Sequence, residues 1–75
     1  MWRIQILIEG QQAVWSMYGT EEAMRNAREE LLDKRPTGEF VTIHGICDSS
    51  DRAPHEMTIK SDEVIAIDLC RMAYT

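Results

Sequence analysis

The chain has 75 residues, of which 44% are hydrophobic and 28% charged, and its formal net charge at pH 7 is −5. This length accommodates one domain, residues 1–75, and the apolar content excludes a disordered chain. The negative charge disfavours nucleic acids and anionic membranes as partners, and no apolar run approaches the roughly 18 residues of a membrane span. No basic stretch followed by an apolar run begins the chain. We therefore expect a cytoplasmic protein whose two cysteines are thiols.

The first 18 residues predict a β-hairpin. Apolar and polar side chains alternate from Trp2 to Glu9, which is the pattern of a strand with one buried face. Leu7 is the apolar exception on the polar face. Gly10 begins a short turn, and residues 13–18 are rich enough in aromatic side chains to form the second strand. Both faces of this second strand carry large side chains.

Residues 20–35 predict an amphipathic helix. Thr20 is a favourable N-cap, and the two glutamates that follow it suit the positive end of the helix dipole. Lys34 and Arg35 suit the opposite end, and Pro36 stops the helix. Apolar residues spaced three and four positions apart form one narrow stripe, expected to lie on a sheet: Ala23, Met24, Ala27, Leu31 and Leu32.

The second half of the chain predicts three strands, at residues 39–47, 55–60 and 64–71. The polar connection over residues 48–54 is rich in turn formers and is expected to be a mobile loop, whereas residues 61–63 form a tight corner. The last strand has the densest β signal of the chain, and both of its faces are apolar. We therefore expect it to be buried on both sides, near the middle of the sheet.

This order of elements predicts an α+β fold. We expect a two-layer sandwich, in which an antiparallel sheet of four or five strands carries one helix on one face. The sheet has four strands if the last two predicted strands form one bent strand. A small, strongly bent barrel is the alternative. Because a chain of this size buries only about 60% of its unfolded surface, we also expect a partner subunit to add stability.

The distribution of large apolar side chains predicts an interface. Trp2 and Phe40 are expected to fill the core under the helix. Trp15 and Tyr18 point to opposite faces of one strand, so one of them faces outward. One helix can cover only one sheet face, and large apolar groups exposed together usually mark an interface. We predict an interface on the sheet face away from the helix, formed by Leu7, Val14, Trp15, Tyr18, Val64 and Ala66.

The two histidines and two cysteines are the residues that could carry chemistry. His44, Cys47, His55 and Cys70 belong to residue types that bind zinc, but they lack the close pairs typical of structural zinc sites. Cys47 and His55 would meet as a thiol and base if the intervening residues close a hairpin, but nearby carboxylates disfavour a thiolate. A Cys47–Cys70 disulfide requires neighbouring strands. We therefore expect no metal, no cofactor and no catalytic residue.

These observations predict a small binding protein that is not an enzyme. We expect a homo-oligomer, joined through the sheet face away from the helix, that acts on a protein partner, as an inhibitor or adaptor of phage or mobile-element origin would. The alternative is a protein that binds or sequesters a nucleotide-like small molecule in a groove between subunits, using arginines and an aromatic platform. Nucleic-acid mimicry is less favoured, because the carboxylates alternate with arginines along the helix.

Overall fold

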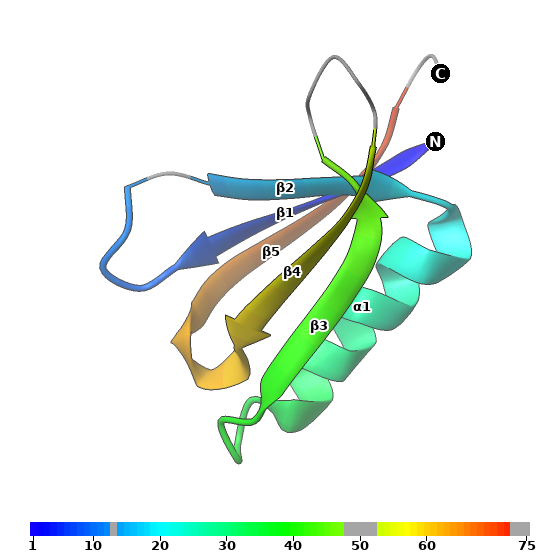
Figure 1. Ribbon diagram of the computed structural model, residues 1–75. Coiled ribbons are helices and arrows are strands. Elements are labelled where there is room, and N and C mark those ends of the chain that lie inside the picture. The colour runs from blue at the N-terminus through cyan, green and yellow to red at the C-terminus, as the bar shows by residue number, and fades with distance from the viewer. Residues whose placement is uncertain (13, 48–52, 73–75) are drawn as a thin grey trace.

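The computed structural model describes residues 1–12, 14–47 and 53–72 (Figure 1). The strands form one antiparallel sheet in the order β4-β3-β2-β1-β5, and the helix between β2 and β3 packs on it. The predicted α+β fold is therefore confirmed, with five strands, because a single turn of 3₁₀ helix separates the last two. The elements in chain order are β1 (Trp2–Ile8), β2 (Val14–Gly19), α1 (Glu21–Lys34), β3 (Phe40–Ile46), β4 (Pro54–Lys60), η1 (Ser61–Glu63) and β5 (Val64–Arg71).

The helix α1 begins and ends close to the predicted positions. The Thr20 hydroxyl accepts a hydrogen bond from the backbone N–H of Ala23 at 3.1 Å, which satisfies one of the free donors of the first turn. After the last turn, Gly38 has a positive φ of 71°, and its N–H donates to the carbonyl of Lys34 at 3.0 Å. Among the described residues, no helix is long and apolar enough to cross a membrane.

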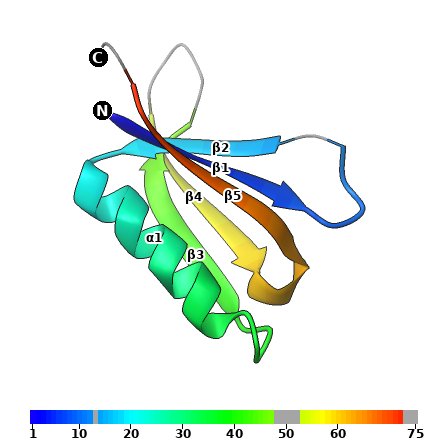
Figure 2. The ribbon, with the colours of Figure 1, turned by 180° about the vertical axis from the view of Figure 1, so that it is seen from behind.

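The sheet divides into two wings. In the described residues, β2 and β3 pair at a single register position, Tyr18 opposite Ile46. By contrast, β3 and β4 pair along their whole length, from Phe40–Lys60 to Ile46–Pro54. We call β2-β1-β5 the hairpin wing and β3-β4 the second wing. Figures 1 and 2 show the two wings meeting near the end of β2 and diverging from there.

The core fills the space between the two wings and α1. Both wings and the helix contribute buried side chains to it, and Trp2, Ile67 and Leu69 pack against it while remaining partly exposed. The prediction that Trp2 fills the core is therefore not met, because its ring lies at the edge of the core. The Arg25 guanidinium lies 5.0 Å from the centre of this ring. The buried members are Ile4, Ile6, Ile8, Met17, Met24, Ala27, Leu31, Val41, Ile43, Met57, Ile59 and Val64.

The position predicted for the last strand is wrong. β5 lies at an edge of the sheet and has β1 as its one strand neighbour within the described residues. Its apolar residues do not bury both faces, because Ile65 is 57% exposed and Ala66 is also exposed. The two-sided apolar pattern therefore reflects an edge strand with uncovered apolar side chains, which is uncommon in a protein that lacks a partner at that edge.

The prediction that Phe40 fills the core is also wrong, since its side chain is 66% exposed. Side chains alternate along β3, and Val41 and Ile43 take the two inward positions. Phe40 therefore points to the outer face, opposite Lys60 of β4. Ala13, and residues 48–52 of the predicted loop, lie outside the described part of the chain.

Candidate binding cleft along β4

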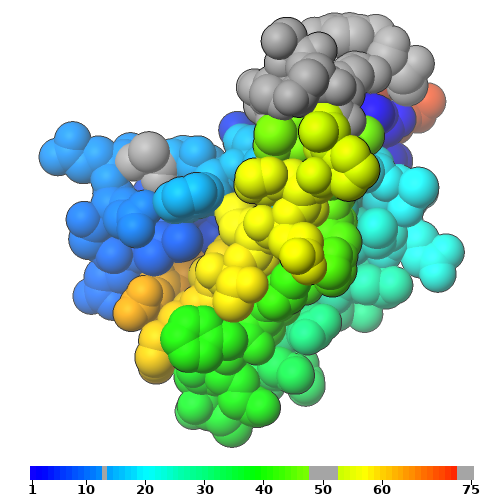
Figure 3. Space-filling model, viewed as in Figure 1, coloured from blue at the N-terminus to red at the C-terminus, as the bar shows by residue number. Residues whose placement is uncertain are grey.

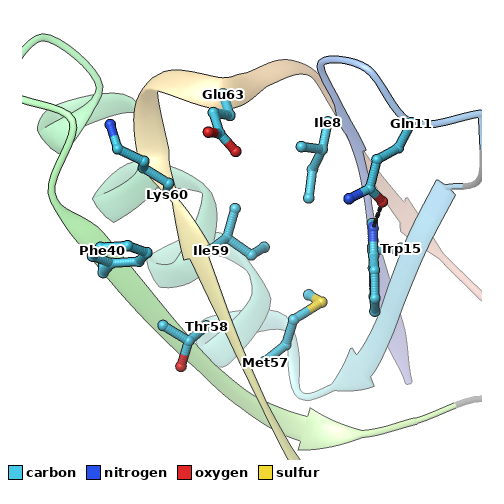
Figure 4. Close-up of a pocket in the computed structure, with 9 residues that line it drawn as sticks. All are labelled: Ile8, Gln11, Trp15, Phe40, Met57, Thr58, Ile59, Lys60 and Glu63. Carbon is cyan, nitrogen blue, oxygen red and sulfur yellow. Dashed lines mark hydrogen bonds between the residues drawn. The ribbon is translucent and has the colours of Figure 1, made fainter.

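A cleft of about 310 Å³ separates β4 from the hairpin formed by β1 and β2. Figure 3 shows the hollow between the hairpin, in blue, and β4, in yellow. Three members of the core, Ile8, Met57 and Ile59, form its apolar floor. In Figure 4, the side chains of Met57 and Ile59 extend from β4 toward the hairpin. The cleft is therefore the place where the core between the two diverging wings reaches the surface.

The cleft follows the free edge of β4. Four consecutive residues of this strand line it, Met57 to Lys60. Because successive side chains of a strand point to opposite faces, a hollow lined by four in a row must border the edge rather than one face. β4 is an edge strand, with β3 as its one strand neighbour in the described residues. Such an edge presents backbone N–H and C=O groups that no adjacent strand pairs.

Two exposed aromatic side chains flank the cleft, one from each wing. Trp15 of β2 is 44% exposed, and Phe40 of β3 is the more exposed of the two. The indole N–H of Trp15 donates to Oε1 of Gln11 at 2.8 Å (Figure 4). This hydrogen bond satisfies the single polar group of the indole, so the ring is left with apolar surface to offer a ligand.

Polar side chains also line the cleft, from both β4 and the hairpin. The ammonium of Lys60 donates to both carboxylate oxygens of Asp62 at 2.8 Å, so its charge is already paired. Glu63 lies beside Ile8 and Ile59 in the lining, and the Thr58 hydroxyl is hydrogen-bonded to that of Thr42 at 2.9 Å. The cleft is therefore apolar along its floor and aromatic at its sides, which suits recognition of a side chain and a backbone.

The predicted interface residues separate into two groups. Val14, Leu7 and Ala66 lie side by side across β2, β1 and β5, since Leu7 is opposite Val14 on one side and Ala66 on the other. We call these three residues the outer row. Tyr18 lies on the same outward face, opposite Arg3. Trp15 is opposite Ile6 and points to the other face of the sheet, where it lines the cleft. Trp15 and Tyr18 therefore point to opposite faces, as predicted.

The outward placement predicted for Val64 is wrong. The register between β1 and β5 shifts between Leu7 and Ile8, so Val64 pairs with Ile8 rather than with a residue of the outer row. This irregularity turns Val64 into the core, where it is only 4% exposed. Ala66, on the regular side of the shift, remains on the outward face.

The structure does not assemble the histidines and cysteines into a site. His44 Nδ1 lies 3.5 Å from Glu56 Oε2 on the exposed face of the second wing, and His55 is opposite Gly45. Cys47 and Cys70 form no disulfide, and β3 and β5 are not neighbouring strands. Within the described residues, no three His, Cys, Asp or Glu side chains are grouped as a metal site would need.

Sequence reasoning missed the cleft itself. It depends on the divergence of β2 from β3, and periodicity within each strand carries no information about that angle. One signal was present, because Gly45 lies inside a strand, where glycine often marks a close backbone approach. A Cβ at this position would lie 2.5 Å from the carbonyl oxygen of Tyr18.

No family model, curated protein or solved structure matches the chain. The function has to be inferred from a small α+β fold with two open sheet edges in its described part, and from the cleft along one of them.

Proposed function

We propose that the protein is a non-enzymatic binding protein that holds an extended segment of a protein partner along the free edge of β4. The observation that carries the proposal is the lining of the cleft by four consecutive residues of this edge strand. A segment lying there would add a strand to the sheet. In this mode of recognition, main-chain hydrogen bonds supply affinity, and pockets for alternate side chains supply specificity.

The composition of the cleft indicates which side chain the segment presents. Its floor consists of Ile8, Met57 and Ile59, and Trp15 forms the facing wall. Burial of a leucine- or phenylalanine-sized side chain contributes about 1.5–3 kcal/mol. We therefore expect the partner segment to place a large apolar residue in the cleft, with polar neighbours on the outer face of the extended sheet.

Binding of a synthetic peptide tests the proposal. The probe is a fluorescein-labelled peptide of about eight residues that alternates threonine with leucine, a length typical of a strand. Its control is the same peptide N-methylated at alternate amides, which removes the main-chain donors of one edge. Fluorescence anisotropy with the full chain should show saturable binding of the probe and loss of binding for the N-methylated form. Equal binding of the two peptides would contradict strand addition.

Matched variants locate the binding site. Trp15→Ala removes one wall of the cleft and should weaken binding of the probe by about tenfold, which corresponds to 1.4 kcal/mol. Leu32→Ala removes an exposed apolar side chain of α1 that does not line the cleft, and it should leave the affinity unchanged. An unchanged affinity for Trp15→Ala would show that the probe does not occupy the cleft.

Self-association through the outer row is a second candidate, favoured by the register that places Val14, Leu7 and Ala66 side by side. Ala66→Glu introduces a charge at one end of this row and should convert a dimer to a monomer in light scattering at high micromolar concentration. Ile65→Glu introduces the same charge at an exposed residue of the same strand that does not belong to the outer row, and it serves as the control. A wild-type chain that is monomeric at that concentration would exclude this candidate.

The nucleotide-like ligand of the alternative prediction requires arginines beside an aromatic platform. Trp15 and Phe40 line the β4 cleft, whereas Arg28 and Arg35 line a separate hollow that shares no described lining residue with it. Arg25 does stack over Trp2, but its guanidinium is already paired with Glu21, at 2.8 Å from Nε to Oε2. This arrangement gives the nucleotide alternative no support.

A further inference from the structure

The opposite edge of the sheet, β5, borders a hollow of its own. Its volume is about 250 Å³, and four consecutive residues of β5, Val64 to Ile67, line it. As at β4, a run of consecutive lining residues places the hollow along the edge of the strand. The facing side is formed by Arg28 and Leu32 of α1 and by Arg35, which directly follows the helix. We call this hollow between α1 and β5 the arginine groove.

The arginine groove is cationic although the protein is acidic. Among the described residues that line it, both charged side chains are arginines, in a chain with a net charge of −5. The Nε atom of Arg28 is buried and has no hydrogen-bond partner in the described part of the chain. Arg35 Nε donates to the backbone carbonyl of Val64 at 3.2 Å, which anchors its guanidinium beside β5. Guanidinium groups in such positions bind carboxylates preferentially.

Apolar side chains accompany these charges. Leu32 of α1 and Ile65 of β5 are both exposed and lie across the groove from each other. An adjoining hollow of about 450 Å³ shares Leu32 and Arg35 with the groove and continues toward Pro36 and Asp62. The Asp62 carboxylate is already paired with the ammonium of Lys60 at 2.8 Å. A ligand that neutralises the arginines and also carries methylene groups would cover this surface better than a simple anion would.

We propose that the arginine groove binds an extended acidic segment of a partner protein, in which glutamates alternate with apolar residues. Alternate side chains of a strand added to β5 point to opposite faces. The glutamates of such a segment face α1, where their carboxylates meet Arg28 and Arg35 and their methylene groups cover Leu32 and Ile65. The apolar residues face outward beside Ala66 and extend the outer row by one strand. This site is distinct from the β4 cleft and does not depend on the function proposed for it.

A pair of synthetic peptides tests the charge requirement. The probe is a labelled, capped peptide of about eight residues that alternates glutamate with valine, and the control alternates lysine with valine. Fluorescence anisotropy with the full chain should show binding of the glutamate peptide, no binding of the lysine peptide, and a weaker affinity at high salt. Equal binding of both peptides, or no binding of either, would overturn the proposal.

Charge reversal locates the segment. Arg28→Glu should weaken binding of the glutamate peptide by about tenfold and allow the lysine peptide to bind. Arg28 is half-buried, so its substitution can also affect folding. Ile65→Ser changes an exposed position and provides a second variant, which should also weaken binding of the glutamate peptide. Trp15→Ala, in the β4 cleft, should leave binding of the glutamate peptide unchanged. Loss of binding for Trp15→Ala with none for Arg28→Glu and Ile65→Ser would overturn this proposal and leave the function proposed for the β4 cleft intact.

Discussion

The hydroxyl of Ser61 donates a hydrogen bond of 3.0 Å to the backbone carbonyl of Lys34, and Ser61 is fully buried. The contact joins η1, the corner between the two edge strands β4 and β5, to the end of α1. The same carbonyl also accepts hydrogen bonds from the backbone N–H groups of Thr37 and Gly38. One carbonyl of the helix thus holds the corner at which β4 ends and β5 begins.

Ser61→Ala should lower the free energy of unfolding by about 1 kcal/mol, measured by urea denaturation. The loss is limited because the Lys34 carbonyl keeps its other donors and no polar group is left unpaired. Thr37→Ala removes an exposed hydroxyl that donates to the same carbonyl at 2.9 Å, and it should change stability by no more than about 0.5 kcal/mol. Equal losses for the two variants would show that burial of Ser61 adds nothing to this contact.

Gly45→Ala should destabilise the protein by about 3 kcal/mol, because the added Cβ meets atoms of β2. It would lie 2.5 Å from the Tyr18 carbonyl oxygen and 2.7 Å from Met17 Cγ. The carbonyl cannot move away without disturbing the Tyr18–Ile46 pairing that joins the two wings.

Gly10→Ala provides the comparison for this measurement in urea. Gly10 has a φ of 81°, but an added Cβ would meet nothing within 4 Å, so the expected loss is only the backbone strain of about 1 kcal/mol. If Gly45→Ala lowers the free energy of unfolding no more than Gly10→Ala does, the two wings can move apart with little loss of stability.

The local elements could be predicted from the sequence because their signals are local. Thr20 caps α1, Pro36 follows its end, and the alternation in the first eight residues defines the inward face of β1. The opposition of Trp15 and Tyr18 also needed only the two-residue period of a strand, and the register confirms it. Each of these features depends on residues within a few positions of one another.

The order of the strands and the two hollows could not be predicted in this way. Whether β5 is central or at an edge depends on which strand pairs beside it, and its apolar residues fit either arrangement. The shift between Leu7 and Ile8 reverses the side to which Val64 points, and no residue type at these positions signals it. The β4 cleft and the arginine groove depend on the angles between the two wings and the helix. The sequence pattern therefore indicated that apolar residues are exposed, but it did not indicate where the two hollows lie.

A comparison of Phe40 with Ile43 tests the inward face of β3. Phe40→Ala should change the free energy of unfolding by no more than about 0.5 kcal/mol, because the ring is exposed. Ile43→Ala should lower it by about 2–5 kcal/mol, because it leaves a cavity between α1 and the second wing. Urea denaturation measures both. A larger loss for Phe40→Ala than for Ile43→Ala would restore the sequence-based expectation that Phe40 fills the core.

Val64→Asp and Ala66→Asp test the register shift at the start of β5. The two positions are two residues apart, so in a regular strand they would share a face and respond alike. Here Val64 is in the core, and an unpaired carboxylate there should lower the free energy of unfolding by about 3 kcal/mol or more. Ala66 is exposed, and its substitution should lower it by less than about 1 kcal/mol, the range of strand propensities. Thermal unfolding followed by circular dichroism measures both variants, and similar losses would place Val64 and Ala66 on one face and exclude the shift between Leu7 and Ile8.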